Sequence, residues 1–337
     1  MVLMRHLTIC NDNGAVAEIL DFGGIIRRLL VPDRAGRPTN VVTGFADERE
    51  YTDNPCFMGA LIGPACNRTA RAAFTLDGIT YRIPQNEGEN NLHSDDAEGF
   101  HKKTWEVSAL TKDSVTLRLH APDGELGFPG NRDFTVSYSL TGDNALRMIC
   151  DATTDKTTLC NPTQHTYFNL DGARGGEIHG HRARFFASSY LPVGEGMIVT
   201  GERRAVAGSP FDFLEEKEIG RDIDADDAQL LLAGGYDHCF MTDAYDGTLR
   251  RCAVVRSAET GIAMEVKTTL PGFQFYSGNF FDCPRDTEGR HRGIREAFCI
   301  ETQYPPDAVH HPDLPQPVLR RDETYHAETI FRFYIDD

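Results

Sequence analysis

Short segments in which apolar and polar residues alternate follow one another along most of the chain, and they predict an all-β protein. Residues 74–76 and 81–83 flank Asp77-Gly78, a strong signal for a β-hairpin with a tight turn. Only residues 224–233 have the pattern of a helix. Many short strands separated by Gly and Pro are typical of a β-sandwich or barrel. Further strands are predicted at residues 105–110, 115–119, 134–140, 146–152, 164–170, 182–187, 252–257, 263–268, 274–277, 298–303 and 328–334.

No Gly/Ser linker, charge run, low-complexity segment or internal repeat divides the chain. Its 337 residues are enough for two domains by length alone. All-β chains of about 250 residues, however, often fold as one domain. We therefore expect residues 1–337 to form a single large β-sandwich domain.

The charge balance restricts the partners. The chain has 34 basic and 51 acidic side chains, a formal net charge of −17, and no cluster of Lys and Arg of the kind that binds nucleic acid. No apolar stretch approaches the roughly 20 residues of a membrane span, and the N-terminus lacks the apolar core of a signal peptide. We expect a cytoplasmic protein, a monomer or weak homodimer, with neither nucleic acid nor membrane as a partner.

The cysteines and histidines do not indicate a metal or a cofactor. Nine cysteines are scattered without a Cys-x-x-Cys pair, which is typical of reduced and mostly buried thiols. His179-x-His181 and the acidic run at residues 222–227 lack the remaining ligands of a zinc site or a calcium loop, so we predict that they are surface groups. The Gly-rich segments match no nucleotide-binding pattern.

Two segments place polar side chains where a core strand would have apolar ones. In residues 163–170, alternation puts His165, Tyr167 and Asn169 on one face, which indicates either a solvated face or a polar cleft. The apolar run 297–300 ends in Glu301. A carboxylate there is either just exposed at the end of the strand or held for chemistry with a shifted pKa.

Three further positions add charge and hydrogen-bonding groups. Asp237 follows the predicted helix and a double glycine, which predicts a loop tip. Asn67-Arg68 is followed twenty-odd residues later by His93. With His165 and Glu301, these residues supply two imidazoles, two carboxylates and one guanidinium. Such a set suits a neutral polyol, whereas a phosphate would require more cations.

Eight short motifs follow one another in order between residues 67 and 308. They are Asn67-Arg68 before residues 74–78, residues 90–93, residues 127–130, residues 165–172, residues 191–193 with 210–213, residues 236–238, residues 274–279, and residues 301–303 with 306–308. With these motifs the chain resembles the galactose mutarotase, or aldose 1-epimerase, family over nearly its whole length. It departs from the family after His93, where Ser94-Asp95-Asp96 replace small glycines.

The resemblance implies a fold, an activity and a set of site residues. The fold would be a β-sandwich of large, twisted, mostly antiparallel sheets with an open cleft for a free monosaccharide such as galactose or glucose, and no cofactor would be needed. The residue that matches Glu301 would be the general base, and the one that matches His165 the general acid. The substrate-binding positions would be Asn67, Arg68, His93, Tyr167, Asp237 and Gln274.

Interconverting the anomers of a sugar requires one group that takes a proton and another that gives one. Because Glu ordinarily titrates near 4.3 and His near 6.5, we expect Glu301 to be ionised and His165 to be held protonated by neighbouring carboxylates such as Asp237. Three alternatives stay open. They are a mutarotase for a different aldose, a catalytically silent sugar sensor of the same fold, and a glycoside hydrolase or lyase that uses Asp237 as a second carboxylate.

Overall fold

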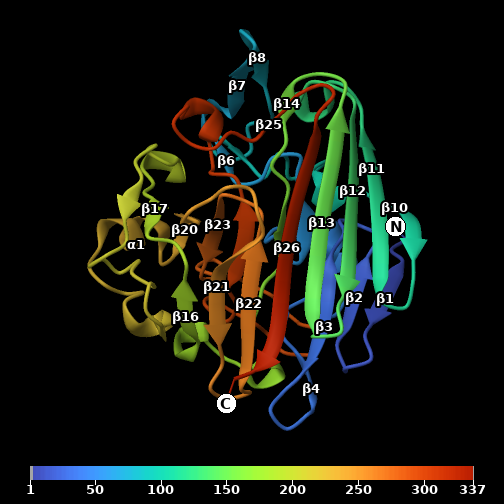
Figure 1. Ribbon diagram of the computed structural model, residues 1–337, viewed down its shortest axis with the longest axis vertical. Helices are drawn as coiled ribbons and strands as arrows, with labels where there is room; N and C mark the ends of the chain where they lie inside the picture. Colours follow the sequence, from blue (N-terminus) through green and yellow to red (C-terminus); the bar gives the residue numbers. More distant parts are fainter. Residues whose placement is uncertain (1–2, 337) are drawn as a thin grey trace.

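The computed structural model describes residues 3–336, and antiparallel β-sheet makes up most of its regular structure (Figure 1). The largest sheet has nine strands in the order β10-β11-β12-β13-β26-β22-β21-β16-β19. In that order their bounds are Glu106–Leu110, Ser114–Ala121, Arg132–Leu140, Ala145–Thr154, Thr324–Ile335, Ile262–Thr268, Arg250–Arg256, Arg182–Phe185 and Lys217–Glu218.

Two smaller sheets complete the sandwich. The first has the order β1-β2-β3-β4, with bounds His6–Cys10, Val16–Leu20, Ile26–Pro32 and Pro38–Asn40. The second has the order β18-β17-β20-β23-β24, with bounds Arg204–Ala205, Ser189–Leu191, Asp237–Met241, Gly272–Tyr276 and Cys299–Gln303.

Four strand pairs stand apart from these sheets: β5 (Ala60–Ile62) with β15 (Thr163–His165), β6 (Arg68–Thr69) with β9 (Asn91–Leu92), β7 (Ala73–Leu76) with β8 (Ile79–Arg82), and β14 (Thr158–Leu159) with β25 (Val318–Leu319). The one α-helix among residues 3–336 is α1 (Ala228–Ala233).

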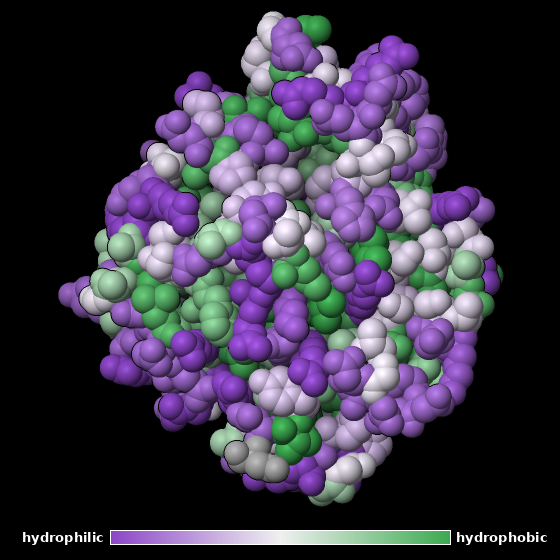
Figure 2. Space-filling view, in the orientation of Figure 1, coloured by the Kyte–Doolittle hydropathy of each residue, from purple (hydrophilic) through white to green (hydrophobic). Residues whose placement is uncertain are grey.

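A continuous cluster of buried apolar side chains lies between the sheets. It joins Phe331 on β26, Ile19 on β2 and Phe273 on β23, so faces of all three sheets contribute to one core. Figure 2 shows that the outward face of the nine-stranded sheet is mainly hydrophilic. On that face Arg147 Nε and Glu328 Oε1 are 2.6 Å apart. The predicted all-β sandwich is confirmed.

The β-hairpin predicted at Asp77-Gly78 is confirmed. Leu76 pairs with Ile79, and Asp77 and Gly78 have φ angles of 50° and 78°, as a two-residue hairpin turn requires.

Two predicted elements are shorter in the structure. The strand predicted at 164–170 ends at His165, because Phe168 forms isolated bridges with Val42 and Phe298 instead of continuing along β5. The helix predicted at 224–233 begins only at Ala228, where the side chain of Asp227 accepts hydrogen bonds from the first free N–H groups.

The remaining predictions concern thiols, surface histidines and membrane segments. All nine cysteines are free and seven are buried, as predicted.

The prediction that His181 is a surface group is wrong. Its ring is buried, and Nε2 accepts a hydrogen bond of 3.0 Å from the N–H of Leu170. Within residues 3–336, we find no helix with the length and apolar character that crossing a membrane requires.

Truncating one core aromatic side chain is expected to destabilise the sandwich strongly. Phe331 is 2 % exposed, and its ring centroid lies 5.2 Å from that of Phe168. Phe331→Ala should lower the free energy of unfolding by about 3–5 kcal/mol, because it leaves a cavity in a packed core. The matched control is Arg332→Ala, the next residue on the same strand. Its exposed ion pair with Asp143 is worth at most about 1 kcal/mol. Urea unfolding of both variants measures the difference, and equal losses would contradict this description of the core.

Candidate active site

Seven of the eight predicted site residues line one cleft of about 410 Å³, and five different segments of the chain supply them. The seven are Asn67, Arg68, His93, His165, Tyr167, Asp237 and Glu301. The eighth, Gln274, lies behind the wall of the cleft. It is 3 % exposed, and its Nε2 donates a hydrogen bond of 2.7 Å to Asp237 Oδ1.

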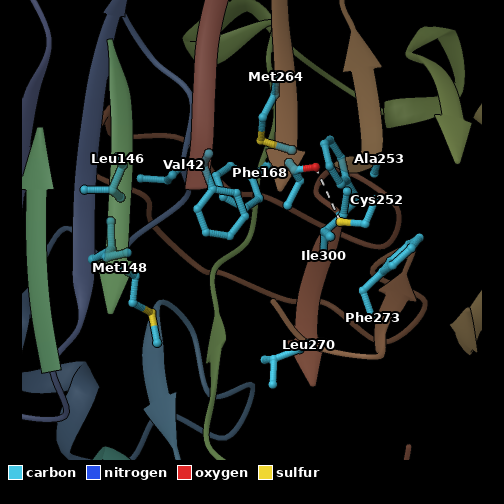
Figure 3. Close-up of a cluster of buried hydrophobic side chains, with 14 of the residues drawn as sticks. Val42, Leu146, Met148, Phe168, Cys252, Ala253, Met264, Leu270, Phe273 and Ile300 are labelled. Atoms are coloured by element: carbon cyan, nitrogen blue, oxygen red, sulfur yellow. Dashed lines mark hydrogen bonds between the residues drawn. The ribbon is translucent and has the colours of Figure 1, made fainter. Parts of the chain in front are cut away.

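Glu301 reaches the cleft because β24 alternates. Ile300 points into the core cluster together with Phe168 and Phe273 (Figure 3), so Glu301 projects from the opposite face of the strand. Glu301 is only 2 % exposed, which decides between the two interpretations of the apolar run: the carboxyl group is buried and does not emerge at the strand end. Among residues 3–336, no group forms a hydrogen bond with Oε2. Burial raises the pKa of Glu301 well above its usual range, the charge of Asp237 adds to the rise, and Arg68 opposes it.

His165 is the nearest base to this carboxyl group. Its Nε2 lies 3.7 Å from Glu301 Oε1, and its ring is 5 % exposed. Burial lowers the pKa of His165 to about 4. The burial of both groups therefore opposes the expectation that Glu301 is ionised and that Asp237 keeps His165 protonated. Desolvation favours the neutral form of both groups, and Asp237 contacts Arg68 and Gln274 instead.

Arg68 and Asp237 form the charged side of the cleft. Arg68 Nη1 lies 3.8 Å from Asp237 Oδ2. The guanidinium also donates two hydrogen bonds to Glu87, from Nε at 2.7 Å and from Nη2 at 2.8 Å. Asp237 begins β20 and is partly buried, so its predicted place at a loop tip is wrong. Burial raises the pKa of Asp237, while Arg68 and Gln274 limit the rise.

His93 carries a fixed hydrogen-bonding pattern. The backbone N–H of Asn67 donates to His93 Nδ1 over 3.1 Å, so the proton of the neutral ring lies on Nε2. Burial lowers the pKa of His93 well below its usual range, and the neighbouring His165 and Arg68 lower it further. Ligand atoms of His93, His165 and Glu301 lie within 4.8 Å of one another, a spacing that suits a divalent cation. With Nδ1 already accepting and Nε2 protonated, however, His93 presents a donor and no lone pair to such an ion.

The departure from the family after His93 affects the loop and not the wall of the cleft. Ser94 adopts a φ of 72°, a conformation that favours glycine. Its Oγ stabilises this conformation, because it donates to Ala65 O over 2.7 Å and accepts from Ala65 N over 3.0 Å.

The row of three polar residues predicted from alternation is only partly correct. Tyr167 lines the cleft with its ring, while its hydroxyl donates to Cys56 O over 3.0 Å. Asn169 does not reach the cleft. It is buried, and its Nδ2 donates to Gly176 O and Glu296 O, so it holds two loops together.

Several residues of the cleft wall were not predicted. The charged one is Glu87, and the others are mainly apolar: Pro55, Cys56, Phe57, Leu92, Met197, Leu232, Ala233, Tyr276 and Phe280. Many come from loops without a regular pattern. Leu92 and Tyr276 lie within the motifs at residues 90–93 and 274–279, which is the one signal that pointed to any of these residues, and Glu87 lies outside every motif.

A β-sandwich with a buried carboxyl group and a buried imidazole side by side in an open cleft has the arrangement of an enzyme site for a small polar molecule. The chain belongs to the aldose 1-epimerase family, whose family model matches residues 5–332. The resemblance found in the motifs is thus confirmed, and the protein is an isomerase that acts on carbohydrates.

Individual relatives cover almost the whole chain. It is 36 % identical over 331 residues to the aldose 1-epimerase of Escherichia coli K12, and the match covers 98 % of this chain and 95 % of that protein. It is 37 % identical over 319 residues to the galactose mutarotase of Bos taurus, which spans 94 % and 91 %. Among solved structures, the aldose epimerase homologue from C. elegans superimposes with a TM-score of 0.91 at 26 % identity, over 99 % of this chain and 100 % of that one. The galactose 1-epimerase from Lactobacillus acidophilus gives 0.86 at 27 % identity, over 99 % and 95 %.

Proposed function

We propose that the protein interconverts the α and β anomers of a free aldohexose such as galactose or glucose, with Glu301 as general base and His165 as general acid. The observation that carries the proposal is this pair. Glu301 is buried, its Oε2 has no hydrogen-bond partner within residues 3–336, and its Oε1 lies 3.7 Å from an equally buried imidazole in an open cleft. The names of the E. coli and Bos taurus relatives support the substrate class.

The chemistry needs two proton transfers, one at each of the two oxygens bonded to the anomeric carbon. Glu301 takes the proton of the anomeric hydroxyl while His165 Nε2 gives a proton to the ring oxygen, so the bond from the anomeric carbon to the ring oxygen breaks and an aldehyde forms. Rotation about the bond to the carbonyl carbon, followed by the reverse transfers, closes the ring as the other anomer.

Burial makes the two groups share one transferable proton. Burial favours protonated Glu301 with neutral His165, because desolvation disfavours both charges. The same protonation state results from ring opening, when Glu301 has gained a proton and His165 has lost one. The closed sugar reacts with ionised Glu301 and protonated His165. This state forms when a proton moves from Glu301 to His165, and the net charge of the pair does not change.

Neighbouring residues bind and orient the sugar. Asp237 and Arg68 provide an acceptor and donors for the hydroxyl groups, and their mutual contact keeps both side chains in place. His93 offers its Nε2–H as a permanent donor because the Asn67 N–H holds the other nitrogen. Gln274 acts through Asp237, and the ring of Tyr167 forms part of the wall.

The pH profile should report the shared proton. Below about 4, His165 gains a proton while Glu301 already holds one, so no base is left and kcat/KM should fall as the pH falls. Because the pKa of Glu301 is raised, its carboxyl group loses its proton only at a pH above the usual range of a carboxyl group. The pair then holds no proton to donate, so the rate should fall as the pH rises further. Initial rates from pH 3 to 10 test this, after subtraction of the spontaneous reaction. A rate that already declines as the pH falls below about 6.5, the ordinary range of His, would contradict it.

A panel of freshly dissolved α-aldoses tests the function itself. Polarimetry should show that the protein accelerates the approach to anomeric equilibrium for at least one of galactose and glucose. Acceleration only with other aldoses would correct the substrate. Binding without any acceleration would identify a silent sugar-binding protein, and release of a new reducing end from a disaccharide would identify a hydrolase.

A further inference from the structure

Strand β24 presents two side chains to the ring of His165, one to each nitrogen. Cys299 and Glu301 are two residues apart, so both project from the same face of the strand. Glu301 Oε1 lies 3.7 Å from Nε2, and Cys299 Sγ lies 3.6 Å from Nδ1. Cys299 is completely buried, so solvent does not compete for this contact.

The proposed mechanism gives a different role to each ring nitrogen of His165. The proton shared with Glu301 enters and leaves Nε2, the nitrogen that faces it. A neutral imidazole carries one N–H, so Nδ1 must keep its proton while Nε2 alternates. A buried N–H requires an acceptor, and the side chain that faces Nδ1 is the thiol of Cys299.

We propose that Cys299 is a positioning residue: its sulfur accepts the Nδ1–H of His165 and thereby fixes the orientation and the tautomer of the ring. This inference rests on the proposed function of the Glu301–His165 pair. This hydrogen bond leaves the lone pair of His165 Nε2 facing Glu301 and the cleft.

A thiol suits this position better than a carboxylate. A carboxylate at Nδ1 stabilises the imidazolium and holds the second proton on the ring, whereas a neutral, weak acceptor fixes the geometry without holding that proton. Burial and the nearby Glu301 raise the pKa of Cys299 well above its usual range, so the sulfur stays a neutral thiol. His93 shows the opposite arrangement, because a backbone N–H donates to its Nδ1. The two histidines of the cleft are thus set as opposite tautomers.

The test combines two substitutions of Cys299 with nitrogen NMR of the full-length protein labelled with 15N-histidine. In the wild type without sugar, His165 should show a protonated Nδ1 and an unprotonated Nε2, and His93 the reverse. The signal of His165 is assigned by its absence in His165→Asn. In Cys299→Ala, His165 should become a mixture of tautomers while His93 is unchanged, and kcat should fall about tenfold with KM within about threefold. Cys299→Ser supplies a hydroxyl acceptor, so it should restore the Nδ1–H form with a changed Nδ1 shift and keep at least about a third of kcat.

The matched control is Cys252→Ala, which removes another fully buried thiol, on β21, in the core and away from the cleft. It should lower stability without changing either histidine signal or kcat. A wild-type tautomer and a wild-type kcat in Cys299→Ala would overturn the proposal. If the alanine variant does not fold, an unchanged Nδ1 shift in Cys299→Ser overturns it. Because the tautomer is read without sugar, this outcome is separate from a failure of the acid/base proposal, which would show as unimpaired kcat in Glu301→Gln.

Discussion

Replacing Glu301 with Gln should lower kcat for anomer interconversion by about 10²–10⁴-fold, because general acid/base catalysis contributes about that much and the amide cannot accept the proton. The shape of the side chain is retained, so KM should change only a few-fold. Rates are measured by polarimetry on fresh α-galactose and α-glucose. A variant that keeps more than about a tenth of wild-type kcat would remove Glu301 from the mechanism.

The same substitution should raise stability at neutral pH. The pKa of Glu301 is raised in the folded protein, so the folded state keeps a proton that the unfolded chain releases as the pH rises through about 4.3. Stability of the wild type is therefore lost as the pH rises, and Gln, which does not titrate, escapes this loss. Thermal unfolding should show Glu301→Gln above the wild type at pH 7, with the gap closing below about pH 4.

The matched control for Glu301 is Glu265→Gln. Glu265 is also buried, but it lies on β22 and pairs with Arg251 and with Lys267 at 3.1 Å, away from the cleft. Removing its charge leaves those cations without their partner, so this variant should be less stable and keep its kcat. A more stable but slower Glu301→Gln, beside a less stable but fully active Glu265→Gln, would show that the two buried carboxyl groups have different roles.

Replacing His165 with Asn is the second large effect, again about 10²–10⁴-fold in kcat, because no acid remains for the ring oxygen. The pH profile distinguishes this loss from a structural one. The variant should also lose the fall in kcat/KM below about pH 4, since that limb belongs to His165. The control is His181→Asn, which removes an equally buried imidazole that accepts the N–H of Leu170, and which should lose stability but not kcat. An acid limb that persists in His165→Asn would contradict the assignment.

The sandwich was predictable because its strands carry a local signal. Strands such as β12 and β26 alternate regularly, and the hairpin at Asp77-Gly78 has its turn written in two residues. The four strands of the N-terminal sheet were not predicted. In β2 and β3 the polar positions are too few for a clear alternation, whereas β1 does alternate and was missed.

The site was predictable where a polar residue interrupts an apolar pattern. Glu301 at the end of an apolar run and His165 in a core-like segment are both of this kind. Alternation failed at Asn169 because β15 ends at His165 and the chain turns to make bridges with two other segments. The protonation states were not predictable either. The pKa shifts of His165 and Glu301 come from burial, which depends on loops and sheets that close over them from distant parts of the sequence.

The double variant Glu301→Gln/His165→Asn tests whether Glu301 and His165 act as one unit on one shared proton. Substitutions of groups that act as a unit are strongly non-additive, so we expect kcat of the double variant to lie within about threefold of the slower single variant. Exchange between the anomeric proton signals of galactose, followed by NMR at equilibrium, measures all four rates under the same conditions. If the two losses multiply, so that the double variant is slower by the product of the single effects, the two residues act independently and do not share a proton.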